Sequence, residues 1–483
     1  MENAIHIEDT ADSRAAQGRH RLAFGGLFLF TLLLYARPNE AFPGLLGDFP
    51  IVKIVAVFTL FTYIASKIAA GEKLTVWPVE FKMLVMLTAL GLVLIPIAQS
   101  PQDSIDLLTE LFLKVVTIFM LMINLLDSRE RLRSMMKLVV IAGTVLAFFA
   151  ISNFVAGKFQ VADKHVGIRI AGVVGGIFEN PNDLATSLCL LVPMAVALAL
   201  TSVGLARIGY SACAAMLSIA VVLTFSRGGF LGLASVAGVL LWKLARRNRA
   251  LSAFGLIATL GVFLAAMPTG YSNRITSIFD SESDPTGSSQ ARIELLNRAA
   301  AVASGHIVVG VGMGNFHTYS IREQRAHNSF LEISAELGVA GLIAYLVMIF
   351  APLRSLRQIE RETIGTPRHS HSIVGERGSN GNHDYYFSVA LQTSLIAYIV
   401  CSFFGSIQYL WFLYYPLAYA VALRAIHRAD SLGGQETVPQ VSPVLRPLAT
   451  EGVLWKSRGT SLRRPMIEAA KTSAGDSGGP NGY

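Results

Sequence analysis

The chain has 483 residues, of which 53% are hydrophobic and only 15% are charged, and its mean hydropathy is +0.51. This composition excludes an ordinary soluble protein of that length and indicates a polytopic membrane protein. The net charge of +8 does not point to nucleic acid as a partner, because no basic domain interleaved with aromatic residues accompanies it. The three cysteines, Cys189, Cys213 and Cys401, lie in apolar runs without the spacing of a disulfide framework or a zinc site.

Apolar runs near the ~20 residues that cross a bilayer predict about twelve membrane helices. We therefore expect an all-α integral membrane protein. The first run lacks a small-residue cleavage site and ends at Arg37-Pro38, so we interpret it as a span and not as a cleaved signal peptide. The expected spans are 21–36, 50–70, 80–99, 108–126, 134–156, 182–202, 208–225, 229–245, 250–267, 328–352, 386–405 and 407–425.

The orientation follows from the short loops, because Lys and Arg near span ends are retained in the cytoplasm. Alternate loops are basic, whereas the loop between the third and fourth spans carries Asp103 and Asp106. The basic set is expected to be cytoplasmic, which also places both termini there. Its members are Arg14, Arg19, Arg21, Lys67, Lys73, Arg129, Arg131, Arg133, Lys137, Arg207, Lys243, Arg246, Arg247, Arg249, Arg354, Arg357 and Arg361.

The chain divides into three expected parts. Residues 1–20 form a cytoplasmic N-terminal segment, residues 21–425 a polytopic transmembrane domain, and residues 426–483 a cytoplasmic tail rich in Gly, Ser, Pro and Arg. Two long connections interrupt the domain: 353–385 is polar and cytoplasmic, and 268–327 is periplasmic by the same count. We expect the tail and the 353–385 connection to be mostly disordered.

The stretch GGIFENPNDLATSL (175–188) leads into the sixth expected span. Asp183 is suited to cap that helix. Capping does not account for Asn180, Asn182 and Glu179 together, so Asn182 is an auxiliary candidate for substrate binding at the membrane edge.

The stretch TFSRGGF (224–230) places Arg227 in a very short turn on the periplasmic side, where two glycines leave the backbone uncovered. One interpretation is an arginine that snorkels from a helix end. The other is a phosphate ligand, because the planar guanidinium fork matches phosphate oxygens.

Within the periplasmic connection, QARIELLNRAAAVASG (290–305) predicts an amphipathic helix that lies against the membrane surface. Arg292 is on its polar face, where it is either solvated, paired with Glu294 or available for a phosphate. The passage GHIVVGVGMGNF (305–316) follows, and its glycines permit tight turns and close backbone approach to a ligand. The predicted apolar face of the helix comprises Ile293, Leu296, Ala300 and Ala303.

The next span opens with AHNSFLEISAELGVAGL (326–342), an unusually polar start. Ser329 and Glu332 fit a capping box, although a functional role for Glu332 stays open. Glu336 lies one turn deeper, where an ionisable group indicates a pairing or binding role. His327, with the Asn328 amide beside it, stands at a helix N-terminus whose N–H groups and dipole favour anions. A base beside an anion site predicts group transfer.

These stretches resemble the O-antigen ligase and polymerase superfamily of bacterial envelope glycosyltransferases. The resemblance rests on five motifs in a fixed order and extends over about residues 20 to 425. The motifs are FENPNDLA (178–185), SRGGFLG (226–232), Gln290-Ala291-Arg292, GVGMGNF (310–316) and HNSFLEISAELGVAGL (327–342). It implies a multi-pass protein of the bacterial inner membrane that takes a glycan from undecaprenyl diphosphate on the periplasmic face. It also implies that Arg227 and Arg292 bind the donor diphosphate and that His327 activates the acceptor hydroxyl, without a cofactor or metal.

The residues themselves fit that chemistry. A sugar hydroxyl needs a base to attack the anomeric carbon, and an imidazole that titrates near neutrality is suited to accept the proton. Arginines would stabilise the leaving diphosphate, and direct displacement would invert the anomeric configuration. A ligase that uses the lipid A core as acceptor is favoured, with polymerase and protein O-glycosylation ligase as alternatives. A membrane transporter is the alternative from another class.

Overall fold

The computed structural model describes residues 20–37, 50–157, 160–163, 167–170, 178, 180–246, 288–320, 323–364 and 375–436. Helices dominate this part of the chain, as expected. A two-stranded antiparallel hairpin is an addition to the predicted all-α fold: β1 (Gln160–Asp163) pairs with β2 (Gly167–Ile170), with Gln160 opposite Ile170. The predicted span at 250–267 and the tail beyond residue 436 lie outside the described residues.

Every other expected span overlaps a described helix, although the span expected at 407–425 is a helix only from Trp411 onwards. Eight described helices are long and apolar enough to cross a membrane. The count of twelve stays a prediction. In chain order the main helices are α2 (Arg21–Ala36), α5 (Ile51–Ala69), α6 (Val79–Val93), the short α7 (Pro101–Asp106), a π-helical turn (Leu107–Phe112), α8 (Leu113–Leu125), α9 (Arg129–Val155), α10 (Pro181–Leu200), α11 (Gly204–Leu223), α12 (Arg227–Ala245), α15 (Ser288–Gly305), α16 (Ser329–Ile364), α17 (Gly375–Ser402) and α18 (Tyr414–Glu436).

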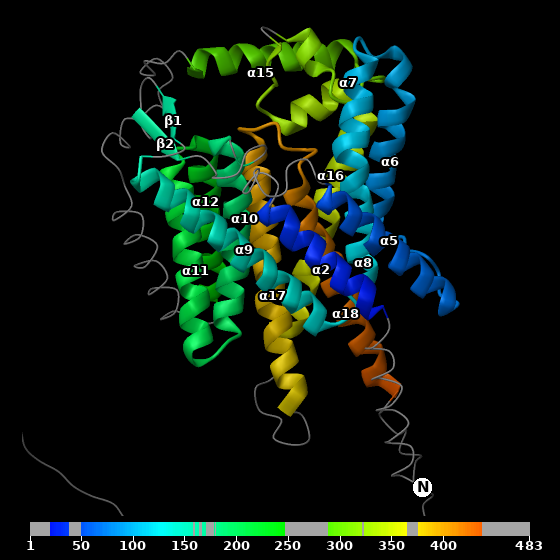
Figure 1. The fold of residues 1–483 in the computed structure, drawn as a ribbon, viewed down its shortest axis with the longest axis vertical. Coiled ribbons are helices and arrows are strands. Elements are labelled where there is room, and N and C mark those ends of the chain that lie inside the picture. The colour runs from blue at the N-terminus through cyan, green and yellow to red at the C-terminus, as the bar shows by residue number, and fades with distance from the viewer. Residues whose placement is uncertain are drawn as a thin grey trace, which may run out of the picture. The chain divides into compact units, whose positions relative to one another are not determined.

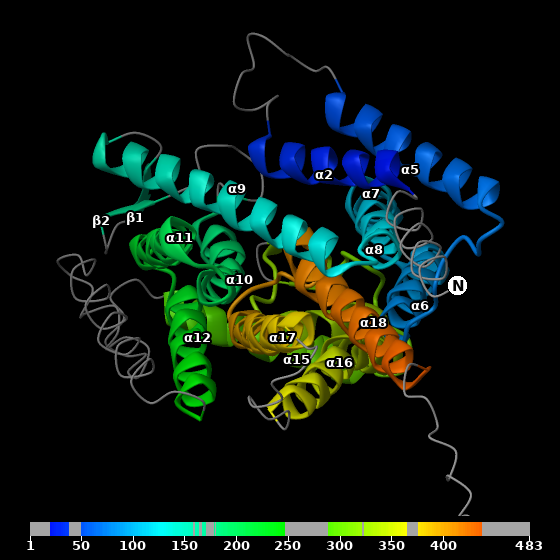
Figure 2. The same cartoon turned by 90° about the horizontal axis from the view of Figure 1, so that it is seen from below.

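The apolar helices divide into central and peripheral ones. The most apolar window of α10 is 83% buried inside the protein, whereas that of α5 is only 11% buried. Figure 2 shows α17 surrounded by α10, α12, α16 and α18, and α5 on the outside against α2. A helix that is apolar on every side satisfies either environment, so burial within the protein and contact with lipid cannot be told apart by hydropathy.

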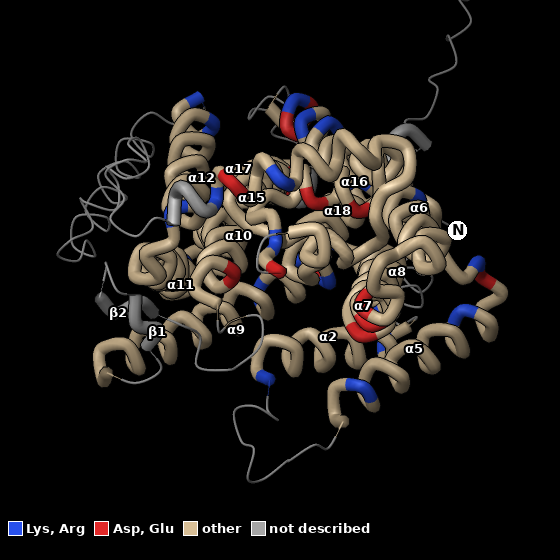
Figure 3. Tube along the Cα trace, turned by 90° about the horizontal axis from the view of Figure 1, so that it is seen from above, with Lys and Arg blue, Asp and Glu red and all other residues tan. Residues whose placement is uncertain are grey.

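The two ends of the bundle differ in what lies on them (Figure 1). One end, hereafter the α15 end, carries α7, α15 and the N-terminus of α16. Seen from above, Figure 3 shows acidic residues gathered on α7, which includes Asp103 and Asp106. The other end, hereafter the opposite end, carries the C-terminus of α16, the N-terminus of α17 and the C-terminus of α18.

The connection expected to be disordered at 353–385 is instead largely helical, because α16 continues to Ile364 and α17 begins at Gly375. Buried polar contacts stabilise these extra turns. Glu360 near the end of α16 accepts hydrogen bonds from Lys243 of α12 and from Gln392 of α17. Glu360 is therefore a partner in helix packing, whereas Arg354, Arg357 and Arg361 of the same connection are exposed.

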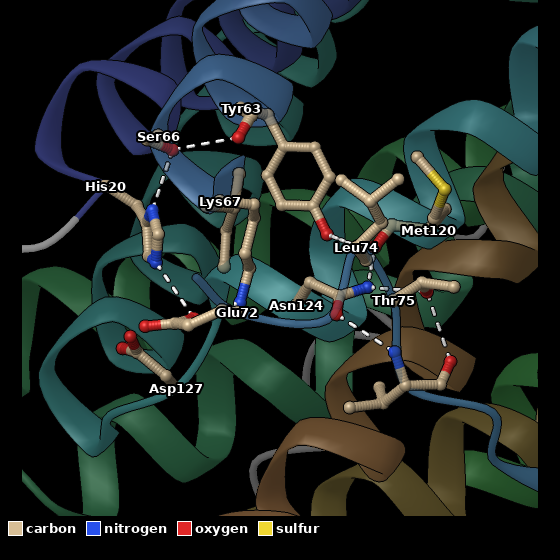
Figure 4. Close-up of polar contacts among 12 residues, drawn as sticks. His20, Tyr63, Ser66, Lys67, Glu72, Leu74, Thr75, Met120, Asn124 and Asp127 are labelled. Atoms are coloured by element: carbon tan, nitrogen blue, oxygen red, sulfur yellow. Dashed lines mark hydrogen bonds and ion pairs between the residues drawn. The ribbon is translucent and has the colours of Figure 1, made fainter. Parts of the chain in front are cut away.

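At the opposite end, polar side chains also connect α2, α5 and α8 with the segment between α5 and α6. His20, at the start of α2, contacts the Ser66 hydroxyl at 2.7 Å and Glu72 at 3.3 Å (Figure 4). Lys67 donates to the same Glu72 carboxylate at 2.6 Å, and this hydrogen bond lowers the pKa of Glu72. The Asn124 amide in α8 donates to Thr75 at 3.0 Å.

Candidate functional site

Residues 326–328, hereafter the approach to α16, directly precede that helix. Within this segment, the backbone of His327 is in the left-handed region at φ 53°. Its backbone N–H donates to the Ser406 hydroxyl at 3.0 Å. Asn328 then caps the helix, because its side-chain oxygen accepts from the N–H groups of Phe330 and Leu331, both at 3.0 Å. The expected cap was Ser329, so that prediction is wrong by one residue. The side-chain oxygen of Asn328 is thus engaged in the cap.

Glu332 reaches back towards the chain before the helix, but not to the Ser329 N–H of the predicted capping box. Its carboxylate accepts from the Ala326 N–H at 3.0 Å, from the Gln408 amide at 2.9 Å and from the Ser406 hydroxyl. Ser329 instead donates to the Gly405 carbonyl at 2.8 Å. In a capping box, Ser329 and Glu332 would each bond to the other's backbone. Here the link between α17 and α18 supplies partners to both side chains instead.

Glu336 is also buried, with 1% of its surface exposed. Its carboxylate accepts from the Phe316 N–H at 3.2 Å and from the Tyr409 hydroxyl at 2.7 Å. The expectation of a pairing role for this residue is met by these two contacts. Glu336 thereby fastens the glycine-rich passage to α16 and to the α17–α18 link.

The glycine-rich passage 305–316 lies along a break in α16. Gly338 has φ 67° within the helix, and the Val339 N–H donates to the Ile307 carbonyl at 2.8 Å. A Cβ at Gly310 would lie 2.2 Å from the Glu336 carbonyl, so only glycine fits there. The close backbone approach that these glycines permit is therefore an approach to α16 itself.

The helix predicted at 290–305 is present as α15, but it packs through a face adjacent to the predicted one. Leu295, Ala299 and Val302 are buried, whereas Ile293 is 48% exposed. Ala299 and Val302 join a small second core whose other members are Val311, Phe316, Ala326 and Ala335. The face is rotated because α15 packs on α16 and the glycine-rich passage, a surface that the sequence of the helix alone does not define.

Two arginines act on the His327 imidazole. Burial, followed by the positive charges of Arg292 and Arg325, lowers the pKa of His327 to about 4. The expectation of an imidazole that titrates near neutrality is therefore wrong for the protein without substrate. Arg325 was not among the predicted site residues. Its position two residues before His327 was the available signal.

Arg227 is the first residue of α12, after Ser226, whose hydroxyl accepts from the Gly229 N–H at 3.2 Å. The next residue, Gly228, packs on the α17–α18 link, since a Cβ there would lie 2.9 Å from the Cβ of Phe404. That link also carries Ser406, the partner of the His327 backbone. The α17–α18 link therefore contacts both the turn that carries Arg227, through Phe404, and the approach to α16, through Ser406.

The charge of Arg325 acts both on Asp183, near the N-terminus of α10, and on His327. The start of α10 therefore lies near the approach to α16. Asn180 caps α10 by accepting from the Asn182 N–H at 2.9 Å. The cap is thus Asn180 and not the predicted Asp183. The Asn182 side chain lies in the first turn and is half-buried, while Glu179 lies outside the described residues.

The arrangement has the chemistry of an anion site. Helix N-termini and guanidinium groups both favour negative charge, and here Arg292 and Arg325 accompany the start of α16. The low pKa keeps His327 neutral at physiological pH, so a ring nitrogen has a lone pair that can accept a hydrogen bond. Among the described residues, no group of three or more His, Cys, Asp or Glu side chains is placed to hold a metal ion.

Comparison with known proteins bears on the family resemblance. The model of the O-antigen ligase family (Wzy_C) matches residues 212–346, which confirms the resemblance inferred from the sequence motifs. The matched segment contains Arg227, Arg292 and His327. The match supports a role in lipid-linked glycan transfer or ligation, and with the apolar helices it indicates a multi-pass bacterial membrane protein.

The other comparisons add little. No curated protein matches the chain. One solved chain, from "Structural coordination of polymerization and crosslinking by a peptidoglycan synthase complex", is 18% identical with a TM-score of 0.38. The alignment covers 73% of this chain and 98% of that one. At that TM-score the likeness carries no argument about this protein.

Proposed function

We propose that this protein transfers a glycan from undecaprenyl diphosphate to an acceptor hydroxyl on the periplasmic face, as an inverting, metal-independent transferase of the O-antigen ligase type. The observation that carries the proposal is that the positive charges of Arg292 and Arg325 act on a half-buried His327. A neutral base beside fixed cations is what the attack of a hydroxyl on a diphosphate-linked sugar requires.

The donor diphosphate is bound by Arg227 and Arg292 in this proposal. Guanidinium forks pair with phosphate oxygens through two parallel hydrogen bonds, and they stabilise the negative charge that the leaving diphosphate gains. Asn182 and Asn328 offer amide groups to the sugar or to the phosphates. Glu336 was predicted to bind substrate, and we now assign it the role of holding the glycine-rich passage through Phe316.

His327 takes the proton of the acceptor hydroxyl. The acceptor oxygen forms the new bond to the anomeric carbon, the bond from that carbon to the diphosphate breaks, and the proton passes to the imidazole. A low pKa makes the free imidazole a weak base. Binding of the donor brings negative charge beside Arg292 and offsets its effect, so the imidazole becomes more basic when the substrate is present.

The membrane arrangement follows the basic loops. Both termini lie in the cytoplasm of the bacterial inner membrane, and the α15 end faces the periplasm. The favoured acceptor is the lipid A core. Polymerase and protein O-glycosylation ligase use the same donor chemistry and remain the alternatives.

Loss of the gene tests the proposal through what accumulates. We expect polymer to be absent from the lipid A core and retained on the carrier lipid. Loss of long chains with single units still attached to the core would instead identify a polymerase. An unchanged envelope together with altered solute uptake would contradict glycan transfer and favour a transporter.

A further inference from the structure

The approach to α16 is held by side chains that come from a distant part of the sequence. Ser406 lies in the α17–α18 link, 79 residues after His327, and accepts the His327 backbone N–H at 3.0 Å. Its own hydroxyl proton is donated to the Glu332 carboxylate. That carboxylate also accepts the Ala326 N–H at 3.0 Å. Two consecutive peptide N–H groups, those of residues 326 and 327, are therefore fixed by one serine and one glutamate.

The backbone at His327 needs such support. A non-glycine residue with a positive φ is disfavoured, and the surrounding structure must hold it there. Because the direction of a side chain follows its backbone, relaxation of φ from 53° would turn the imidazole away from its present surroundings. Those surroundings include Arg292 and Arg325, which act on it electrostatically.

Further hydrogen bonds between the start of α16 and the α17–α18 link hold Ser406 and Glu332 in place. Ser329 donates to the Gly405 carbonyl at 2.8 Å and accepts the Ile407 N–H at 3.0 Å. The Gln408 amide donates to the second oxygen of Glu332 at 2.9 Å. Glu332 is 3% exposed and Gln408 is 1% exposed, so water does not compete for these bonds.

We propose that Ser406 and Glu332 are positioning residues for His327, which hold its backbone in the left-handed conformation that directs the imidazole into the arginine-rich site. Neither side chain touches the substrate in this account. The catalytic part of the proposal rests on the proposed function, whereas the positional part concerns the imidazole alone.

The first arm of the test measures glycan transfer by the full-length protein in detergent, with a lipid-linked glycan as donor. Ser406→Ala removes both the acceptor for the His327 N–H and the donor to Glu332. We expect its kcat to fall between about tenfold and about 10²-fold, the scale that a small misplacement of a catalytic group produces. Ser406→Thr keeps the hydroxyl and is expected to retain most of the activity.

Ser394→Ala is the matched control. Ser394 is a buried serine of α17 that donates to the Leu190 carbonyl at 2.7 Å, so its loss costs a comparable hydrogen bond away from His327. Its kcat should stay at the wild-type level. Equal losses of kcat in Ser394→Ala and Ser406→Ala would show a general effect on the fold and overturn the positioning role.

The second arm does not depend on activity. Diethyl pyrocarbonate modifies only unprotonated imidazoles, and peptide mass spectrometry resolves the His327 product. The pH midpoint for modification of His327 should lie near its lowered pKa of about 4 in the wild type. In Ser406→Ala and Glu332→Gln it should rise towards about 6.5, because an imidazole that leaves the site regains the ordinary pKa of histidine.

The two arms separate the two hypotheses. A wild-type protein without transferase activity would count against the proposed function, and the modification midpoints would still decide the positional part. Unchanged midpoints in both Ser406→Ala and Glu332→Gln would overturn the positioning role even if the wild type is an active transferase.

Discussion

His327 at the α15 end and His427 at the opposite end are the same residue type in opposite settings. Burial and, after it, arginine charges lower the pKa of His327 to about 4. His427 contacts Asp384 and Glu362, both at 2.9 Å, and its hydrogen bond to Asp384 is the main cause that raises its pKa. The surroundings favour the neutral form of the His327 imidazole and the charged form of the His427 imidazole.

The difference distinguishes charged residues that hold helices together from charged residues that act on a candidate catalytic group. At the opposite end, cations meet carboxylates: Arg129 pairs with Asp384 at 2.6 Å, and Arg424 meets Glu80 at 2.7 Å. At the α15 end, the carboxylates of Glu332 and Glu336 accept backbone N–H groups, while arginine charge acts on the histidine. We therefore expect substitutions at one end to change catalysis and those at the other to change stability.

The largest effect on activity is expected from His327→Ala. Loss of a general base typically costs about 10²–10⁴ in rate. The thermal stability of the detergent-solubilised protein should stay close to that of the wild type, because the backbone contacts of residue 327 remain. Full activity in a normally inserted variant would remove His327 as the base.

The largest effect on stability is expected from Glu80→Ala. Glu80 is fully buried and receives two hydrogen bonds from Arg424, at 2.7 and 2.8 Å. Removal of one partner from a buried ion pair typically costs about 3–5 kcal/mol, which a thermal melt of the purified protein would register. The double variant Glu80→Leu with Arg424→Leu should recover much of that loss, and a double variant as unstable as the single one would show that charge pairing is not the cause.

Arg227→Lys and Arg292→Lys are expected to have intermediate effects. Both keep the charge but lose the planar fork, and loss of one donor to a developing anion costs up to about 10²–10³ in rate. Arg207→Lys is a control, because Arg207 donates to the Ser202 carbonyl in the α10–α11 turn. Steady-state kinetics with lipid-linked donor is the measurement. Kinetics as in the control would mean that the two arginines only snorkel.

The smallest effect is expected from His427→Gln, which should lower stability by about 1 kcal/mol, the usual net value of one hydrogen bond. The sign with pH follows from the raised pKa. The stabilisation by a protonated His427 is complete below the ordinary pKa of histidine and is lost as the pH rises through the raised folded-state value. Melting curves should therefore differ more between variant and wild type at pH 6 than at pH 9, and the reverse order would contradict the ion pairing.

The sequence predicted the elements better than their contacts. Apolar runs located the helices, and helix-end signals with a family resemblance selected Arg227, Arg292 and His327, whose roles stay predictions. The break at Gly338 and the rotated face of α15 were not predictable, because both depend on the glycine-rich passage that packs against them. The roles of Ser406 and Gln408 depend on contacts more than 70 residues apart, which no local pattern encodes.

Glu332 and Glu336 show the same limit. Their placement in a membrane helix predicted partners, and the partners exist. Which partners they are follows only from the fold, since Ala326 and Phe316 N–H groups are brought to them by chain segments that local patterns treat as loops. The capping signal located the start of α16 but predicted Ser329 as the cap, whereas the cap is Asn328. Ser329 donates to the α17–α18 link instead.

The most direct test of the account is the pH dependence of kcat/KM for glycan transfer, which reports the free enzyme. The base must be unprotonated, so activity should be lost only as the pH falls through the His327 pKa of about 4. In Arg325→Gln one positive neighbour is removed, the pKa rises, and the loss of activity should begin at a higher pH. An acid limb near pH 6.5 in both proteins would contradict a site in which arginine charge and the His327 imidazole act together.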